Sequence, residues 1–323
     1  MRISIPTHSR RDHIIASFDS LAFHGLMLRN IAKYRTIYEF LKRRGSGLRV
    51  LDAGAGTGII SVLAVSAGAG HVIAVEREAV AFQVMSDWLR RHPSIRKKIK
   101  LIHGDVVQIC GELDPFDIAI SETVGYFGFE EGLGLIAQAL CKEPNALASF
   151  FPNRVSIRLL AIGRWPFPSA QKRFVLSSSD LSRVSAPCTH LSDTESVAVT
   201  SEAASFTSIC RSSSRIRVDG AAILVSASLD ETSRMENWNG QSWPRLFVQF
   251  GQPLLLDPGA ELRLSLTLAH QPFQATIRVE CDGRLVEIID YHSREEIDDL
   301  VRYPDGTDCA IHEQLNEVLS HCV

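Results

Sequence analysis

Apolar residues recur at helical spacing in the first part of the chain. Between Asp19 and Arg44 they fall three or four positions apart, at Leu21, Leu26, Leu28, Ile31, Tyr34, Ile37, Tyr38 and Leu41. This spacing places them on one face of a helix and predicts one or two amphipathic helices. The sequence Gly45-Ser46-Gly47 then ends the pattern.

Four short apolar runs follow, and helical patterns separate the first three of them. The runs cover residues 48–52, 72–76, 100–103 and 116–120, and the helical patterns cover 59–69 and 78–91. Strands that alternate with helices at this spacing form parallel sheets with right-handed crossovers. We therefore predict a doubly wound α/β domain over residues 48–151, preceded by a helical segment over residues 1–47.

The pattern changes after Phe150-Phe151-Pro152-Asn153. Short, partly alternating runs follow at residues 155–162, 221–229, 245–250, 262–268, 275–280 and 285–289. They predict an antiparallel β-domain, either a barrel or a sandwich, over residues 152–323. The serine-rich stretch 177–213 has few large apolar residues and is predicted to be loop. A helical pattern returns only in the tail.

Composition indicates an ordinary globular protein. The 323 residues exceed what one hydrophobic core usually serves, and hydrophobic residues make up 45% of them. A net charge of −3 favours neither a nucleic-acid nor a membrane-surface partner. The seven cysteines form no CxxC pair or Cys/His cluster, so we expect free thiols and no zinc site. Without an export signal or an apolar span, we expect a cytoplasmic protein.

A glycine-rich turn links the first strand to its helix. The segment reads Asp52-Ala53-Gly54-Ala55-Gly56-Thr57-Gly58. Glycines let the backbone approach a ligand closely, and the helix N-terminus adds oriented N–H donors. Dinucleotide dehydrogenases have a related GxGxxG loop, but here the spacing is GxGxG and an acid precedes it. Asp52 would repel a pyrophosphate and suits the cationic methionyl part of S-adenosylmethionine, which we predict as the cofactor.

Two further acids follow the next two strands. Glu76 closes the second strand, where a carboxylate can accept hydrogen bonds from both ribose hydroxyls of a nucleotide. The alternative is that Glu76 caps the next helix. Asp105, directly after Gly104, could reach the adenine amino group, and its alternative is a turn aspartate. Together with the glycine loop, the two acids predict a nucleotide site.

An acidic, aromatic loop follows the fourth strand, at the sheet edge where such folds bind ligands. It reads Ser121-Glu122-Thr123-Val124-Gly125-Tyr126-Phe127-Gly128-Phe129-Glu130-Glu131. This loop resembles the double-E loop of the protein arginine methyltransferase family, S-E-x-x-G-Y-x-x-x-x-E. The matching residues are Ser121, Glu122, Gly125, Tyr126 and Glu131. Glu130 competes for the role of the second acid, but the register favours Glu131.

The resemblance extends beyond this loop. Residues 50–61 look like the family's first motif, 72–76 like its ribose-binding strand, and 152–154 like the entry to its β-barrel. Trp243 looks like the tryptophan of the family's Thr-His-Trp loop. The resemblance implies a Rossmann-like class I methyltransferase domain followed by a β-barrel, with substrate contacts from Tyr126 and Trp243.

The N-terminal helices resemble the family's cofactor-covering segment. His24-Gly25-Leu26-Met27-Leu28 is similar to its H-x-x-M-L pattern, which implies that His24 contacts the cofactor. Counting on from His24 puts Lys33 in the place of the arginine that grips the cofactor carboxylate. A shift of two residues puts Arg35 there instead. The sequence does not decide between Lys33 and Arg35, and Arg35 is the residue that we assign provisionally.

The chain departs from the family pattern in three places. Residues 17–21 lack both tyrosines of the family's Y-F-x-x-Y pattern. Ser242 stands where the family has the histidine of Thr-His-Trp, and Asn30 aligns with that histidine's acidic partner. The segment after Ile162, where the family has a helical dimerisation arm, lacks a clear helical pattern. A homodimer built on another surface and a monomer are both open.

Paired acids suit the chemistry that the resemblance implies. A guanidinium is planar, permanently charged and a poor nucleophile. One carboxylate can bind it bidentately, and two together draw its charge toward the nitrogens that they contact. We therefore expect methylation of the guanidino ω-nitrogen of arginine, with a slight preference for free arginine or a small guanidino compound. The alternatives are arginine residues in proteins, another amine, and a catalytically silent binding subunit.

Overall fold

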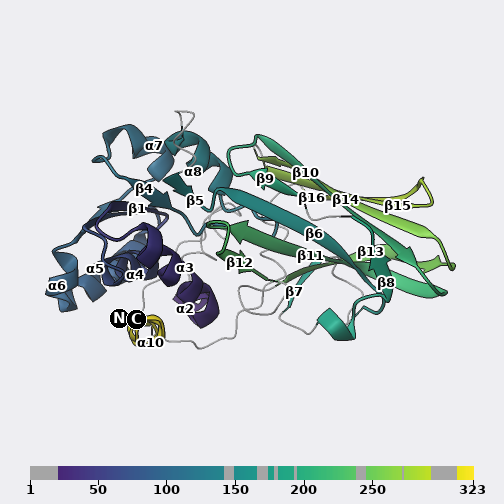
Figure 1. The fold of residues 1–323 in the computed structure, drawn as a ribbon, viewed down its shortest axis with the longest axis horizontal. Coiled ribbons are helices and arrows are strands. Elements are labelled where there is room, and N and C mark those ends of the chain that lie inside the picture. Colours follow the sequence, from purple (N-terminus) through teal and green to yellow (C-terminus); the bar gives the residue numbers. More distant parts are fainter. Residues whose placement is uncertain are drawn as a thin grey trace, which may run out of the picture.

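The computed structural model describes residues 21–141, 149–165, 174–177, 181–192, 195–237, 245–270, 273–291 and 311–323. Helices around a five-stranded parallel sheet form the first half of the chain, and two antiparallel sheets form the second (Figure 1). The predicted α/β and antiparallel β architecture is therefore confirmed. No helix among the described residues is long and apolar enough to cross a membrane.

Two helices begin the described chain, as the apolar spacing predicts. Helix α2 spans Leu21–Leu28 and α3 spans Ile31–Arg44. The side-chain oxygen of Asn30 accepts a hydrogen bond from the backbone nitrogen of Lys33 at 3.2 Å, which satisfies one of the free donors in the first turn of α3. At the other end of α3, Arg43 lies 3.1 Å from Asp230 in the antiparallel half. Helix α3 therefore connects the two halves.

The parallel sheet has the strand order β3-β2-β1-β4-β5. Its strands are β1 (Arg49–Ala53), β2 (His71–Glu76), β3 (Ile99–His103), β4 (Ile118–Ile120) and β5 (Phe150–Phe151). The connections contain α4 (Ile59–Ser66), α5 (Ala79–Arg91), α6 (Pro93–Arg96), α7 (Val106–Ile109), η1 (Cys110–Glu112) and α8 (Leu133–Leu140). The chain moves outward from β1 to β3 and then crosses to β4 on the other side of β1. Such a reversal opens a ligand crevice at the carboxyl ends of the two central strands.

Two antiparallel sheets form the second half. One has the order β7-β13-β11-β6-β9, with β12 paired to β11, and the other has the order β16-β15-β14-β10-β8. The first contains β6 (Arg154–Ile162), β7 (Phe174–Ser177), β9 (Ser196–Ala198), β11 (Ile216–Ser228), β12 (Arg234–Glu236) and β13 (Arg245–Leu256). The second contains β8 (Cys188–His190), β10 (Ala203–Ser212), β14 (Glu261–His270), β15 (Phe273–Cys281) and β16 (Arg284–Tyr291). The turn η3 (Leu181–Arg183) precedes β8, and α10 (Ile311–Cys322) is the helix that the tail predicts.

Strand β10 corrects the prediction that residues 177–213 form a loop. It pairs with β14 from Ala203 to Arg211. Its inward-facing residues are Ala204, Phe206, Ser208, Cys210 and Ser212, which are mostly small or polar, so the usual apolar alternation is hidden. The hydroxyl of Ser208 is nevertheless satisfied, because it accepts a hydrogen bond from the backbone nitrogen of Leu159 at 2.9 Å.

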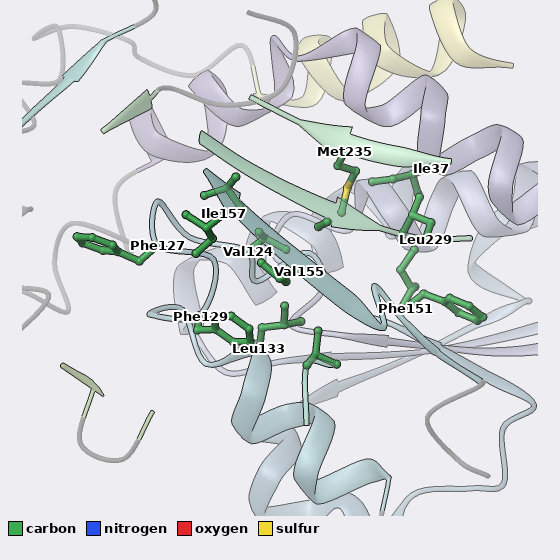
Figure 2. Close-up of a cluster of buried hydrophobic side chains, with 14 of the residues drawn as sticks. Ile37, Val124, Phe127, Phe129, Leu133, Phe151, Val155, Ile157, Leu229 and Met235 are labelled. Atoms are coloured by element: carbon green, nitrogen blue, oxygen red, sulfur yellow. The ribbon is translucent and has the colours of Figure 1, made fainter. Parts of the chain in front are cut away.

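A cluster of buried apolar side chains joins the two halves (Figure 2). It includes Ile37, Val124, Phe127, Phe129, Leu133, Phe151, Val155, Ile157, Leu229 and Met235. Three of these residues belong to the acidic loop after β4. Between them, Gly128 has a φ of +82°, and a Cβ added there would meet the Cγ1 atom of Val155 at 2.8 Å. Burial of one such side chain is worth about 1.5–3 kcal/mol, so core packing anchors the acidic loop.

Candidate functional site

The glycine loop follows β1 at the crevice. Gly54, Gly56 and Gly58 have φ values of +82°, +56° and +89°, a region that side-chain-bearing residues rarely adopt. A Cβ added at Gly58 would lie 2.6 Å from the side chain of Met85 on α5. One added at Gly54 would lie 3.0 Å from the side chain of Thr123. The loop therefore needs glycine for both its conformation and its close packing.

Asp52 lies at the end of β1 and is completely buried. The hydroxyl of Ser61 donates a hydrogen bond of 2.6 Å to its Oδ2 atom. The other carboxylate oxygen, Oδ1, is buried and has no hydrogen-bond partner among the described residues. Burial raises the pKa of Asp52 to about 7, against the lowering effect of Ser61 and with a further contribution from the charge of Glu76. Such a carboxyl group is suited to accept a donor from a bound ligand.

Glu76 lies at the end of β2 and turns toward the glycine loop. Its two oxygens accept hydrogen bonds from the backbone nitrogens of Gly56 and Glu78, each at 2.6 Å. Burial raises the pKa of Glu76, and the two backbone donors act against this. The carboxylate is therefore fixed beside the loop.

Asp105 follows β3 and begins α7. Its side chain accepts a hydrogen bond from the backbone nitrogen of Val107 at 2.9 Å, so it acts as the N-cap of this short helix. Its second oxygen lies 3.9 Å from Arg77. The turn role that the sequence left as an alternative is thus present, and the same residue lies at the carboxyl edge of the sheet.

Glu122 is held in a buried ion pair. Its Oε2 atom lies 2.9 Å from Nζ of Lys33, and their side chains are only 9% and 2% exposed. Burial alone would lower the pKa of Lys33, but Glu122 and the nearby Glu131 contribute to raising it above the ordinary value. The pair lies at the carboxyl end of β4, and Ser121 next to it donates a 2.7 Å hydrogen bond to the backbone oxygen of Ala53.

The two candidates for the second acid have different surroundings. Both carboxylate oxygens of Glu130 accept a hydrogen bond from the backbone nitrogen of Phe127 at 3.0 Å. This carboxylate fills the space beside Gly125, where an added Cβ would lie 2.1 Å from its Cδ atom. Glu130 therefore holds the turn of its own loop, and Gly125 makes room for it. Glu131 is the acid whose charge acts on Lys33.

The structure separates the two candidate cations on α3. Lys33 faces Glu122 and lies 4.9 Å from the ring centroid of Tyr34. Arg35 is exposed and donates a 3.1 Å hydrogen bond to the backbone oxygen of His321 on α10. Helix α3 turns Arg35 away from Glu122, so Lys33 is the cation nearer the acidic loop, and the choice of cation for the cofactor carboxylate stays a prediction. Tyr34, which the sequence suggested only as a core residue, is the unforeseen neighbour of Lys33.

The structure gives fewer contacts for the remaining predicted site residues. The ring of His24 lies against the glycine loop, since a Cβ added at Gly56 would be 3.6 Å from its Cε1 atom. Tyr126 is half-buried and packs on the central core. Trp243 and residues 17–20 lie outside the described residues. Within the described ranges, no three His, Cys, Asp or Glu side chains are grouped to hold a metal ion.

Sequence relatives of this chain are named as protein arginine N-methyltransferases. A segment of 155 residues, 47% of this chain, is 30% identical to protein arginine N-methyltransferase 1 of Chlamydomonas reinhardtii. A segment of 158 residues is 28% identical to the protein of the same name in Schizosaccharomyces pombe. These matches cover 44% and 45% of the relatives, so the chain spans less than half of their length. No family model matches this chain.

Solved structures show the same fold over most of the chain. The Trypanosoma brucei PRMT1 enzyme-prozyme heterotetrameric complex with AdoHcy is similar with a TM-score of 0.69 at 16% identity, covering 86% of this chain and 100% of that one. Protein arginine methyltransferase 10 of Arabidopsis thaliana is similar with a TM-score of 0.64 at 17% identity, covering 86% and 99%. The predicted resemblance and the Rossmann-like fold with its β-barrel-like domain are thereby confirmed.

Proposed function

We propose that this chain is an S-adenosylmethionine-dependent methyltransferase that modifies the ω-nitrogen of arginine. The observation that carries the proposal is the buried pairing of Glu122 with Lys33 at the carboxyl edge of the sheet. A carboxylate that binds an ammonium there can also bind a guanidinium, since both are cationic N–H donors. The sequence relatives and the shared fold support the same activity.

The residues beside the glycine loop fit the cofactor. The unpartnered Oδ1 atom of Asp52 is suited to the cationic methionyl part, and the carboxylate of Glu76 to the ribose hydroxyls. Asp105 is the candidate for the adenine, and His24 lies against the loop. When bound, S-adenosylmethionine supplies an activated methyl group.

Lys33 is our candidate for the cation that holds the cofactor carboxylate. Its ammonium has three donors, of which Glu122 uses one. One side chain can therefore bind the cofactor and position the first acid together. Arg35 points to α10 and is not proposed for this role.

Glu122 and Glu131 bind and orient the substrate in this proposal. A guanidinium placed between two carboxylates is fixed in register, and its positive charge shifts toward the nitrogens that they contact. The remaining nitrogen then has more lone-pair character. The site contributes mainly positioning and electrostatics, in surroundings that packing keeps away from water.

Arginine residues in proteins are the proposed acceptors. The two relatives described above are both called protein arginine N-methyltransferase 1, which favours arginine in proteins over the expected slight preference for free arginine. Parallel incubations with S-adenosylmethionine and either a Gly/Arg-rich peptide or free L-arginine, followed by mass spectrometry, test both the methylation of arginine and the choice of acceptor. A methyl gain on the peptide alone supports the proposal. A gain on free arginine alone refutes the proposal that arginine residues in proteins are the acceptors. If neither acceptor is modified, arginine methylation is itself refuted.

A further inference from the structure

The last helix of the chain packs on the first two helices that the structure describes. Helix α10 lies beside α2 and α3 at the edge of the cofactor half, although the whole antiparallel half separates them in sequence (Figure 1). Its apolar face is formed by Leu315, Val318 and Cys322, which are 1%, 1% and 8% exposed. The helix is thus part of the core of the first half.

Contact with α2 is close. A Cβ added at Gly25, in the middle of α2, would lie 3.1 Å from Oε1 of Gln314. The end of the Gln314 side chain therefore fills the space beside Gly25, where α2 has no side chain. One helix end lies on α3, where Arg35 donates to the backbone oxygen of His321.

Polar contacts fix α10 to α5 on its other side. A ring nitrogen of His312 lies 3.2 Å from the backbone oxygen of Val84, and the other lies 3.1 Å from Arg91. Asn316 accepts a 3.3 Å hydrogen bond from the indole nitrogen of Trp88. Helix α10 therefore joins α5 to α2 and α3.

Both joined helices reach the glycine loop. Helix α2 places His24 against Gly56, and α5 places Met85 against Gly58. The position of α2 depends on its packing partners, because most of the stability of a helix in a protein comes from tertiary packing. The partner from the far end of the chain is α10.

We propose that α10 is a clasp that holds α2 and α5 against the glycine loop, so that cofactor affinity depends on a helix from the opposite end of the chain. The inference rests on the proposed function only in taking the glycine loop as the cofactor site. The clasp itself is a property of the ligand-free protein and can be tested without cofactor.

Two matched double variants of the full chain test the clasp. Leu315→Ala with Val318→Ala truncates the two most deeply buried residues of the apolar face of α10. Leu266→Ala with Val279→Ala makes the same two truncations at residues that are 0% exposed in β14 and β15, which Figure 1 shows far from α10. Amide hydrogen exchange over residues 21–28 is measured without ligand, and the Kd for S-adenosylhomocysteine is measured by calorimetry. We expect the α10 variant to exchange faster in α2 and to bind about tenfold more weakly, and the control to bind within about twofold of wild type.

Each of the other possible results contradicts one part of the proposal. Unchanged exchange in α2, or an equal loss of affinity in both variants, overturns the clasp. Faster exchange with unchanged Kd overturns its control of affinity. If wild type binds no S-adenosylhomocysteine, the cofactor assignment fails, while the exchange data still decide whether α10 holds α2. If the Leu315→Ala, Val318→Ala variant does not fold, a second variant takes its place. His312→Ala with Asn316→Ala removes the polar contacts with α5 and is expected to weaken binding about threefold.

Discussion

Three acids of the site are buried beside one another but have different partners. Glu122 pairs with an ammonium, Glu76 accepts two backbone nitrogens, and Asp52 has a single hydroxyl. A buried carboxylate is costly unless its charge or its lone pairs are matched. Substituting these residues should therefore affect catalysis, stability and pH dependence in different ways.

The substrate acids can be tested by removing their charges. Glu122→Gln and Glu131→Gln should each lower kcat by at least about a hundredfold, because the amide no longer draws the guanidinium charge. The Kd for S-adenosylhomocysteine should stay within about fourfold. Glu130→Gln is the matched control, because its amide oxygen can still accept from Phe127. Loss of activity in Glu130→Gln with normal activity in Glu131→Gln would reverse the assigned register.

The Lys33–Glu122 pair can be tested through stability. Lys33→Met leaves a buried carboxylate without its partner and should lower the free energy of unfolding by about 3–5 kcal/mol in urea titrations. Adding Glu122→Gln to that variant should recover much of the loss, because no buried charge is then unmatched. If the double variant is no more stable than Lys33→Met, the pair is not the cause.

Asp52 should give the free protein a distinct pH dependence. Its pKa of about 7 in the fold lies above the value near 3.9 of an unfolded aspartate, so the folded state holds the proton more tightly. This contribution to stability is complete below pH about 4 and is lost as the pH rises through about 7. Between pH 5 and pH 8, wild type should lose about 2 kcal/mol relative to Asp52→Asn in urea titrations. Parallel pH profiles for the two proteins would contradict the buried, protonated state.

At the scale of elements, β1 to β4 follow their predicted positions closely because each is an apolar run between turn signals, whereas the two-residue strand β5 was not predicted. Helix α8 was not predicted, since its sequence LGLIAQAL has hardly any polar face to reveal a helical period. Strand β10 was missed for the opposite reason, as its inward residues are small or polar. The glycine loop and the acidic loop were predicted from their motifs. The sequence did not decide whether Lys33 or Arg35 faces the acidic loop, because this depends on the rotation of α3.

The glycine loop gives a prediction at this scale. Gly58→Ala should lower stability by about 1–3 kcal/mol and weaken cofactor binding, because the new Cβ is strained at a φ of +89° and meets Met85. Gly111→Ala is the control, since nothing lies within 4 Å of a Cβ added there. Urea titration and calorimetry measure the two effects. Equal behaviour of the two variants would show that the loop tolerates a side chain.

At the scale of the whole molecule, the two halves share a core and a helix. In the acidic loop, the ring of Phe127 lies 5.3 Å from that of Tyr291 in β16, and Gly128 lies against Val155 of β6. Local sequence patterns predict each sheet separately, but they contain no signal for this joint core or for the return of α10. Both depend on contacts between residues far apart in the chain.

Helix α3 is fixed at two points that belong to different halves. Lys33 near its start reaches Glu122, and Arg43 near its end reaches Asp230. Each residue added to a helix rotates all later residues of that helix by about 100° and moves them along the axis by about 1.5 Å. An insertion or deletion between the two residues would thus keep one contact and break the other. In the history of this sequence, insertions and deletions between Lys33 and Arg43 should therefore be rare.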